Sequence, residues 1–313
     1  MTEALASTRA LPRLSLGAVI TVGTFDGVHL GHRAILSRVA RRAADRSLPS
    51  VLVTFEPHPL DVVNPSAAPL LLSTTNEKLE LVAECGIDYA VILPFTPSLA
   101  ALDPSAFVEK LLLDRYCLRE LLIGHDHGFG RGRSGDIHVL RQLGERFDFE
   151  VEMVEAVSVD GAPVSSSVIR RSIASGDLES ARRLLGRRYS FSGHVVHGDQ
   201  RGAKLGFPTL NIALQTPRKL LPPVGVYAIL LDSERGTFGG MMNLGPRPTF
   251  DDPVLSLEVH LFDATGDWYG TPVRVEFVSR LRDTIRFTSV DALVAQLRAD
   301  EHAARAALTQ IKA

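Results

Sequence analysis

The stretch that decides the fold lies at residues 19–32 and reads VITVGTFDGVHLGH. It opens with a short β-branched run, turns at Gly23 and Gly27, and continues into a segment where apolar residues such as Leu36 and Val39 recur at helical spacing. This pattern predicts a strand, a glycine-containing turn and a helix. Such a turn aims free backbone N–H groups and the positive end of the helix dipole at one point, which suits a phosphate.

Two histidines stand at the predicted start of this helix. His29 and His32 flank Gly31 in a His-x-Gly-His pattern. Imidazole N–H groups at this position can bond phosphate oxygens, and glycine lets a phosphate or a flat ring approach the backbone. No Gly-Lys-Ser/Thr follows, so the pattern differs from the common phosphate-binding loop. The alternative interpretation is a buried turn with two incidental histidines.

Predicted strands and helices alternate along the first part of the chain. This alternation predicts a doubly wound parallel α/β domain, expected to span residues 14–187, whose ligands bind at the carboxyl ends of the strands. Further strands are expected at 50–55, 89–93, 121–123 and 149–157, and further helices at 76–85, 105–113, 137–147 and 178–185.

Three segments that follow predicted strands are candidates for binding. Residues 56–59 read EPHP and form a rigid loop. Residues 124–135 hold five glycines and two arginines, which suits either a flap over a nucleotide or a solvated surface loop. Residues 164–171 read VSSSVIRR, and three serines opening a helix next to two arginines suggest a second phosphate clamp. A plain helix cap needs only one serine, and capping remains the alternative for this run.

The pattern changes after residue 187. Short strands separated by Gly/Pro turns are expected at 191–196, 225–231, 237–244, 255–262 and 273–278, which predicts a small antiparallel barrel over residues 188–313. A closing helix is expected at 289–307. Its predicted buried stripe is Val290, Leu293, Val294 and Leu297.

Two motifs of the predicted barrel carry candidate chemistry. In GAKLGFPTLN (202–211), Thr209 and Asn211 point the same way from an extended chain, and their oxygens suit Mg²⁺ with a bound phosphate. In SLEVHLFD (256–263), Glu258 lies on the polar side of an alternating strand. It is either an ordinary exposed carboxylate or a general base that takes a proton from a hydroxyl.

Bulk composition limits the class of protein. The chain has 313 residues, 45% hydrophobic and 22% charged, with a net charge of −2, so nothing favours a nucleic acid or an anionic membrane as partner. No apolar run is long enough to span a bilayer. Residues 1–13 are expected to be a loose extension and not a secretory signal. Cys85 and Cys117 match no metal spacing and are expected to be reduced thiols of a cytoplasmic protein.

These motifs together resemble one family. The string GTFDGVHLGH (23–32) resembles that of the bacterial bifunctional riboflavin kinase/FAD synthetases, a branch of the His-x-Gly-His nucleotidyltransferases. The serine run resembles their Ile-Ser-Ser-Thr-x-Ile-Arg element, with Val164 and Ser167 as conservative departures. The barrel motifs, with NLGPRPTF (243–250), resemble riboflavin kinase. Here Leu210 replaces the usual alanine of Pro-Thr-Ala-Asn, and Ala203 follows Gly202 where many members have arginine.

The resemblance implies two reactions. The barrel would phosphorylate riboflavin with Mg-ATP to give FMN, and the first domain would transfer AMP from ATP to FMN, giving FAD and pyrophosphate. His29, His32 and Glu258 would be catalytic, and Thr209 and Asn211 would hold Mg²⁺. Nucleotide and phosphate contacts are expected from Gly23, Phe25, Asp26, Gly27, Gly31, Gly124, Asp126, Ser165, Ser166, Ser167, Arg170, Gly202, Lys204, Gly206 and Pro208, and flavin contacts from Phe55, Pro57, His58, Phe129 and Phe287.

Two other interpretations stay open at this point. The chain could be a nucleotidyltransferase for another phosphate, with a non-catalytic flavin-binding barrel. It could also be a flavin-binding carrier or regulator whose kinase site no longer turns over. The presence of Thr209, Asn211 and Glu258 together favours an active kinase over both.

Overall fold

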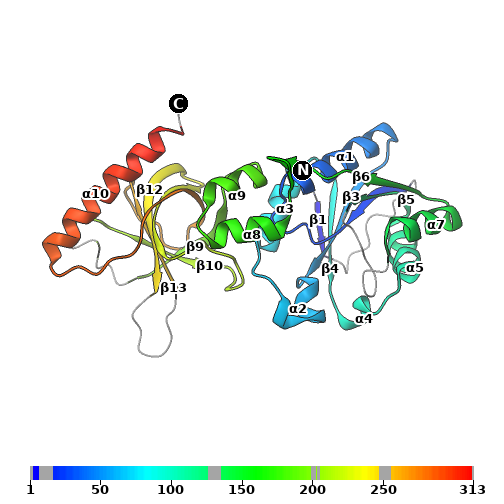
Figure 1. The fold of residues 1–313 in the computed structure, drawn as a ribbon, viewed down its shortest axis with the longest axis horizontal. Coiled ribbons are helices and arrows are strands. Elements are labelled where there is room, and N and C mark those ends of the chain that lie inside the picture. Colours follow the sequence, from blue (N-terminus) through cyan, green and yellow to red (C-terminus); the bar gives the residue numbers. More distant parts are fainter. Residues whose placement is uncertain are drawn as a thin grey trace. The chain divides into compact units, whose positions relative to one another are not determined.

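A computed structural model describes residues 3–6, 17–125, 135–198, 202, 205–246 and 255–311. The chain divides into two compact units, residues 1–166 and 167–313. The first unit is built on an open sheet and the second on a barrel (Figure 1).

The sheet of the first unit has six parallel strands in the order β1-β4-β3-β2-β5-β6. The chain winds outward from β2 through β3 to β4, and then crosses to the other side of β2 for β5 and β6. The predicted doubly wound fold is therefore confirmed, with its switch point between the carboxyl ends of β2 and β5. The strands are β1 Glu3–Ala6, β2 Ala18–Val22, β3 Ser50–Glu56, β4 Tyr89–Pro94, β5 Leu118–Gly124 and β6 Glu150–Val154.

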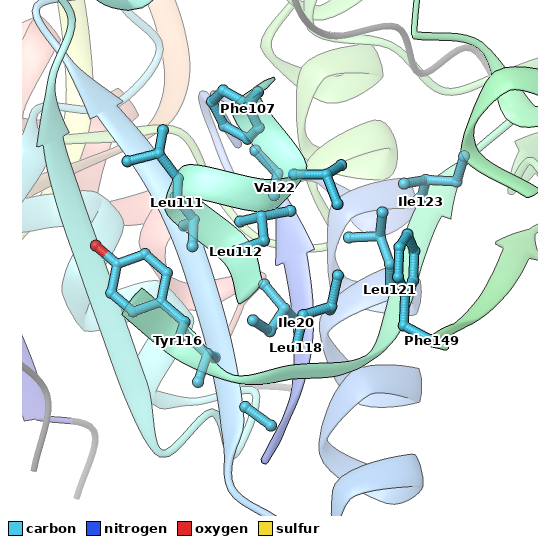
Figure 2. Close-up of a cluster of buried hydrophobic side chains, with 14 of the residues drawn as sticks. Ile20, Val22, Phe107, Leu111, Leu112, Tyr116, Leu118, Leu121, Ile123 and Phe149 are labelled. Carbon is cyan, nitrogen blue, oxygen red and sulfur yellow. The ribbon is translucent and has the colours of Figure 1, made fainter. Parts of the chain in front are cut away.

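Two apolar cores cover the two faces of this sheet, because successive side chains of a strand point to opposite faces. Ile20 and Val22 of β2 belong to one core, with the segment around Leu112 and helix α7 (Figure 2). Val19 belongs to the other, with α1 and α3. The helices are α1 Leu30–Asp45, α2 Pro59–Val63, α3 Thr75–Ala83, α4 Pro97–Ala100, α5 Pro104–Phe107, a π-helical segment Val108–Leu113, α6 Asp114–Tyr116 and α7 Ile137–Phe147. A short 3₁₀ helix, Pro65–Ala67, follows α2, and a small hairpin, β7 Ser158–Val159 with β8 Ala162–Pro163, follows β6.

One expectation for this unit was wrong. Residues 3–6 are not part of a loose extension but form β1, which pairs in parallel with β4 at the edge of the sheet. The unpaired backbone groups of an edge strand can accept a short segment of almost any composition, so side-chain patterning gave no signal for it.

The second unit holds a closed barrel of six strands in the order β10-β13-β12-β11-β14-β9, all antiparallel. The predicted barrel is confirmed, with β10 as an additional strand that closes it between β9 and β13. No described helix is long and apolar enough to cross a membrane. The elements are α8 Ser166–Ala174, α9 Leu178–Leu185, β9 Ser190–Val196, β10 Leu210–Leu214, β11 Gly225–Ser233, β12 Gly236–Pro246, β13 Leu255–Leu261, β14 Pro272–Arg282 and α10 Val290–Thr309.

Helix α10 packs on the barrel through its later turns. Leu308 is buried, and a Cβ at Gly239 of β12 would lie 2.8 Å from its Cδ1. Asp300 is buried and accepts two hydrogen bonds from the Arg282 guanidinium, at 2.8 and 2.6 Å. Val290 was predicted to be buried but is 61% exposed, because the first turn of the helix extends beyond the packed surface.

An ion-pair network ties α1 to the sheet. Glu120 of β5 is fully buried, and its two oxygens lie 2.7 Å from Arg42 Nε and 2.9 Å from Arg46 Nε. Both arginines also pair with Glu150 of β6. Because the arginines lie one turn apart on α1, the network sets the rotation of the helix against the sheet.

We predict that Glu120→Ala lowers the free energy of unfolding by about 2–4 kcal/mol, because it leaves two half-buried guanidinium groups without their buried partner. The measurement is urea denaturation. Glu84→Ala is the control, since Glu84 pairs with Arg33 at 2.6 Å but is 49% exposed, and such pairs contribute less than about 1 kcal/mol. Equal losses in the two variants would contradict a stabilising role for the network.

Candidate active sites

The first site is built on the turn that follows β2. The N–H of Gly23 donates to Val53 O at 3.0 Å, which keeps the start of the turn on the sheet. Phe25, Gly27 and Val28 then adopt φ of 47°, 82° and 37°. This left-handed conformation costs a non-glycine residue about 1–2 kcal/mol, so other contacts have to stabilise the turn.

The buried carboxylate of Asp26 provides those contacts. Its Oδ2 accepts from Leu72 N at 3.0 Å, and its Oδ1 accepts from Ser73 N at 2.9 Å and from Ser73 Oγ at 3.2 Å. The Ser73 hydroxyl in turn accepts from Gly27 N at 2.9 Å. The turn is thereby fastened to the segment that enters α3, and the Asp26 side chain is engaged with the backbone.

The turn delivers the two histidines to the start of α1. His29 is the N-cap, and its Nδ1 accepts from His32 N at 3.3 Å. The two rings stack with centroids 3.6 Å apart. A Cβ at Gly31 would lie 3.2 Å from the His29 ring, so glycine gives this ring its space. Backbone N–H groups of a first helical turn have no carbonyl acceptor within the helix, and a helix start of this kind suits an anion.

Ser166 joins the serine run to this turn. Its Oγ donates to Asp26 O at 3.0 Å, across 140 residues of sequence. Ser165 and Ser166 are the last two residues of the unit that contains the histidines. Helix α8 begins at Ser166. Ser167 and Arg170 continue this helix within the second unit. The hydrogen bond connects two of the segments that the sequence assigned to phosphate binding.

The remaining candidates of the first unit follow strands next to β2. Gly124 ends β5, while Asp126 and Phe129, with the arginines of that loop, lie outside the described residues. Phe55 of β3 is half-buried and packs edge-on against Phe95, with ring centroids 5.3 Å apart. Pro57 is exposed, and His58 caps α2 by accepting from Leu60 N at 3.2 Å. These flavin candidates therefore lie at the carboxyl end of β3.

The second site lies on the barrel, where strand register aligns three polar residues. Glu258 of β13 is opposite Asn211 of β10 on one side and Asn243 of β12 on the other. Residues opposite one another in adjacent strands present their side chains on the same face of the sheet. Ser256 Oγ donates to Glu258 Oε1 at 3.1 Å, which orients a half-buried carboxylate. Phe287 lies beyond β14, with the Arg282 guanidinium 6.0 Å from its ring centroid.

A tight turn leads into β10 and positions Thr209 and Asn211. Gly202 O accepts from both Leu205 N and Phe207 N, at 3.0 and 2.9 Å. Asn211 is buried, and a Cβ at Gly198 would lie 2.0 Å from its Nδ2. Only glycine therefore lets the chain that follows β9 approach this amide so closely. Gly206 has φ of 85°, and Lys204 lies outside the described residues.

His260 fixes the segment just before Thr209. Its Nδ1 lies 2.8 Å from Pro208 O, so this nitrogen carries the proton and donates to the carbonyl. Neither His260 nor the buried Lys78 of α3 was predicted as part of a site. The sequence could have indicated Lys78, because its spacing places it on the same face of the helix as the apolar residues Leu81 and Val82.

The donor set of the barrel suits a magnesium–nucleotide complex. The Thr209 hydroxyl and the Asn211 amide oxygen are hard oxygen ligands of the kind that Mg²⁺ prefers. Among the described residues no group of three or more His, Cys, Asp or Glu side chains could hold a metal on its own. Mg²⁺ is usually bound by few protein ligands together with substrate phosphates and water, so two protein oxygens fit it.

An open hollow of about 510 Å³ lies elsewhere in the first unit. It is lined by residues such as Arg119 and Glu150, which stand near the amino ends of β5 and β6. Those ends form the edge of the sheet opposite the histidines, so this hollow is separate from the site.

Comparison with known proteins places the chain in a family. Residues 12–168 match the family model described as FAD synthetase, and residues 185–308 match that of riboflavin kinase. The bifunctional riboflavin kinase/FMN adenylyltransferase of Escherichia coli (strain K12) is 39% identical over 290 residues, 92% of each chain. The chain belongs to this bifunctional family.

Other relatives agree. The proteins of the same description from Pseudomonas fluorescens and Listeria monocytogenes are 39% and 34% identical, covering 93% and 95% of this chain and 93% and 94% of their own. A crystal structure described as a macrolide-efflux protein from Streptococcus pneumoniae matches with a TM-score of 0.85 and 30% identity, covering 96% of this chain and 98% of that one.

We predict that Asp26→Asn lowers the free energy of unfolding by about 2 kcal/mol. In the wild type both carboxylate oxygens accept from backbone N–H groups, whereas in the variant the amide NH₂ would face one of these donors. Urea denaturation measures the loss. Asp136→Asn is the matched control, since a single oxygen there accepts from both His138 N and Val139 N, and asparagine keeps that oxygen. An Asp26→Asn midpoint as unchanged as that of the control would show that the carboxylate does not hold the turn.

Proposed function

We propose that this chain converts riboflavin to FAD in two ATP-dependent steps. Residues 188–313 phosphorylate riboflavin to FMN, and residues 14–187 adenylylate FMN. The observation that carries the proposal is the order of the two matching family models, FAD synthetase over residues 12–168 and riboflavin kinase over residues 185–308. The FAD synthetase match ends at residue 168 and the riboflavin kinase match begins at 185, which supports a boundary near 187.

In the kinase step, Glu258 accepts the proton of a ribityl hydroxyl while that oxygen attacks the γ-phosphorus of ATP and ADP leaves. Ser256 holds one carboxylate oxygen at 3.1 Å, which aims the other at the hydroxyl. Thr209 and Asn211 would hold Mg²⁺, and the ion would supply positive charge to the transferring phosphoryl group. The hydrogen bond from His260 to Pro208 keeps Thr209 in place.

In the adenylylation step, a phosphate oxygen of FMN attacks the α-phosphorus of ATP, and pyrophosphate leaves. His29, His32 and the backbone N–H groups at the start of α1 stabilise the negative charge, and Ser165 and Ser166 of the same unit contribute the second clamp. The FMN phosphate is already ionised at neutral pH, so this step needs positioning and charge stabilisation and no general base.

We place both reactions in the cytoplasm, with small-molecule substrates only. Cys85 and Cys117 are thiols that form no disulfide, which fits a reducing compartment.

A chromatographic time course of riboflavin with ATP and Mg²⁺ tests the function directly. We expect FMN to appear first and FAD to follow. FMN alone, with added FMN left unchanged, would contradict an adenylyltransferase for FMN and favour another phosphate substrate. No conversion of riboflavin or FMN would favour a flavin carrier.

We expect Glu258→Gln to lower the rate of riboflavin phosphorylation about 10³-fold, because glutamine keeps the shape but cannot take the proton. Adenylylation of added FMN should remain close to wild type. Glu234→Gln, on the exposed turn between β11 and β12, is the control and should leave both rates unchanged. Loss of both activities in Glu258→Gln would contradict two independent sites.

A further inference from the structure

Lys78 of α3 is a buried ammonium that neither reaction uses. Its side chain is on the core side of the helix, and the residue is 6% exposed. Within the described part of the chain the side-chain nitrogen of Lys78 makes one hydrogen bond, to Thr54 Oγ1 at 3.2 Å. Burial lowers the pKa of the Lys78 ammonium, and the negative charges of Asp26 and Glu56 partly oppose this. A methionine would fill the same space without the penalty of burying a charge, so the ammonium needs an explanation.

Thr54 connects Lys78 to the turn after β2. Its Oγ1 also donates to Thr24 O at 3.2 Å, and Thr54 is fully buried. A hydroxyl has one proton, whereas the ammonium can only donate. Lys78 therefore occupies a lone pair of Thr54 and leaves the hydroxyl proton for Thr24. The preceding residue of β3, Val53, accepts from Gly23 N, so β3 holds the start of the turn at two successive residues.

Helix α3 and the segment before it thus fasten the turn on both sides. Ser73, next to the N-cap Thr74, bonds Asp26 and Gly27, while Lys78 acts on Thr24 through Thr54. The left-handed residue Phe25 lies between these two attachments. The direction in which the chain enters α1, and with it the placement of His29, depends on both.

We propose that Lys78 is a positioning residue of the adenylylation site, which acts through Thr54 and the Thr24 carbonyl to fix the turn that presents His29 and His32 to phosphates. This inference rests on the proposed adenylylation of FMN. The competing explanation is that Lys78 and Thr54 form a pair that only stabilises the interior.

The test compares Thr54→Val, Lys78→Met, the double variant and Thr54→Ser in the full chain. Thr54→Val leaves the ammonium without its acceptor and should lower the melting temperature. The double variant makes both partners apolar and should recover most of that loss. FMN adenylylation, measured well below every melting temperature, should nevertheless be lowered about 100-fold in kcat in Thr54→Val, in Lys78→Met and in the double variant, the scale expected for misplaced catalytic groups. A Lys78→Met variant that adenylylates FMN at the wild-type rate would overturn the proposal.

Two controls make the result specific. Thr54→Ser keeps the hydroxyl and should retain adenylylation close to wild type. Riboflavin phosphorylation, carried out by the other unit, should be unchanged in all four variants. Recovery of adenylylation together with the melting temperature in the double variant would overturn the proposal, as would a Thr54→Ser variant as impaired as Thr54→Val. A wild-type chain that does not adenylylate FMN would instead refute the proposed function on which the inference rests.

Discussion

The first unit depends on one constraint, which is that a turn containing phenylalanine and valine in left-handed conformation must be held in place. The Asp26 carboxylate meets it by accepting from Leu72 N, Ser73 N and the Ser73 hydroxyl while it is shielded from water. Buried hydrogen bonds to a charged group are among the stronger interactions in proteins. They offset the strain of the turn, let α1 begin directly at His29, and leave the backbone oxygen of Asp26 to receive Ser166.

In the barrel, strand pairing positions the polar side chains of the proposed site. Its polar row of Asn211, Glu258 and Asn243 follows from the antiparallel register of three strands, and the closed barrel leaves that register little freedom. The proposed first site offers backbone N–H groups and stacked imidazoles at a helix start, whereas the proposed second site offers a hydroxyl, an amide and a carboxylate. This contrast matches the two reactions, because an ionised phosphate needs no base and a hydroxyl does.

The sequence predicted what local patterns encode. Patterns among consecutive residues predicted the strand, turn and helix around His29, the alternating polar face of Glu258 and the change of periodicity near residue 187. The structure adds what depends on distant partners. The role of Lys78 requires knowing that Thr54 lies against α3, and that of His260 requires the return of Pro208 to β13. The edge strand β1 and the exposure of Val290 depend on packing against elements far away in sequence.

The measurement that tests the central account most directly is a crystal structure of the chain with Mg²⁺ and a non-hydrolysable ATP analogue. The account predicts phosphate oxygens within hydrogen-bond distance of the His29 and His32 rings and of the first N–H groups of α1. It also predicts that Asp26 keeps its bonds to Leu72 and Ser73. Phosphates bound away from α1, or an Asp26 carboxylate released from Ser73 to contact the nucleotide, would contradict it.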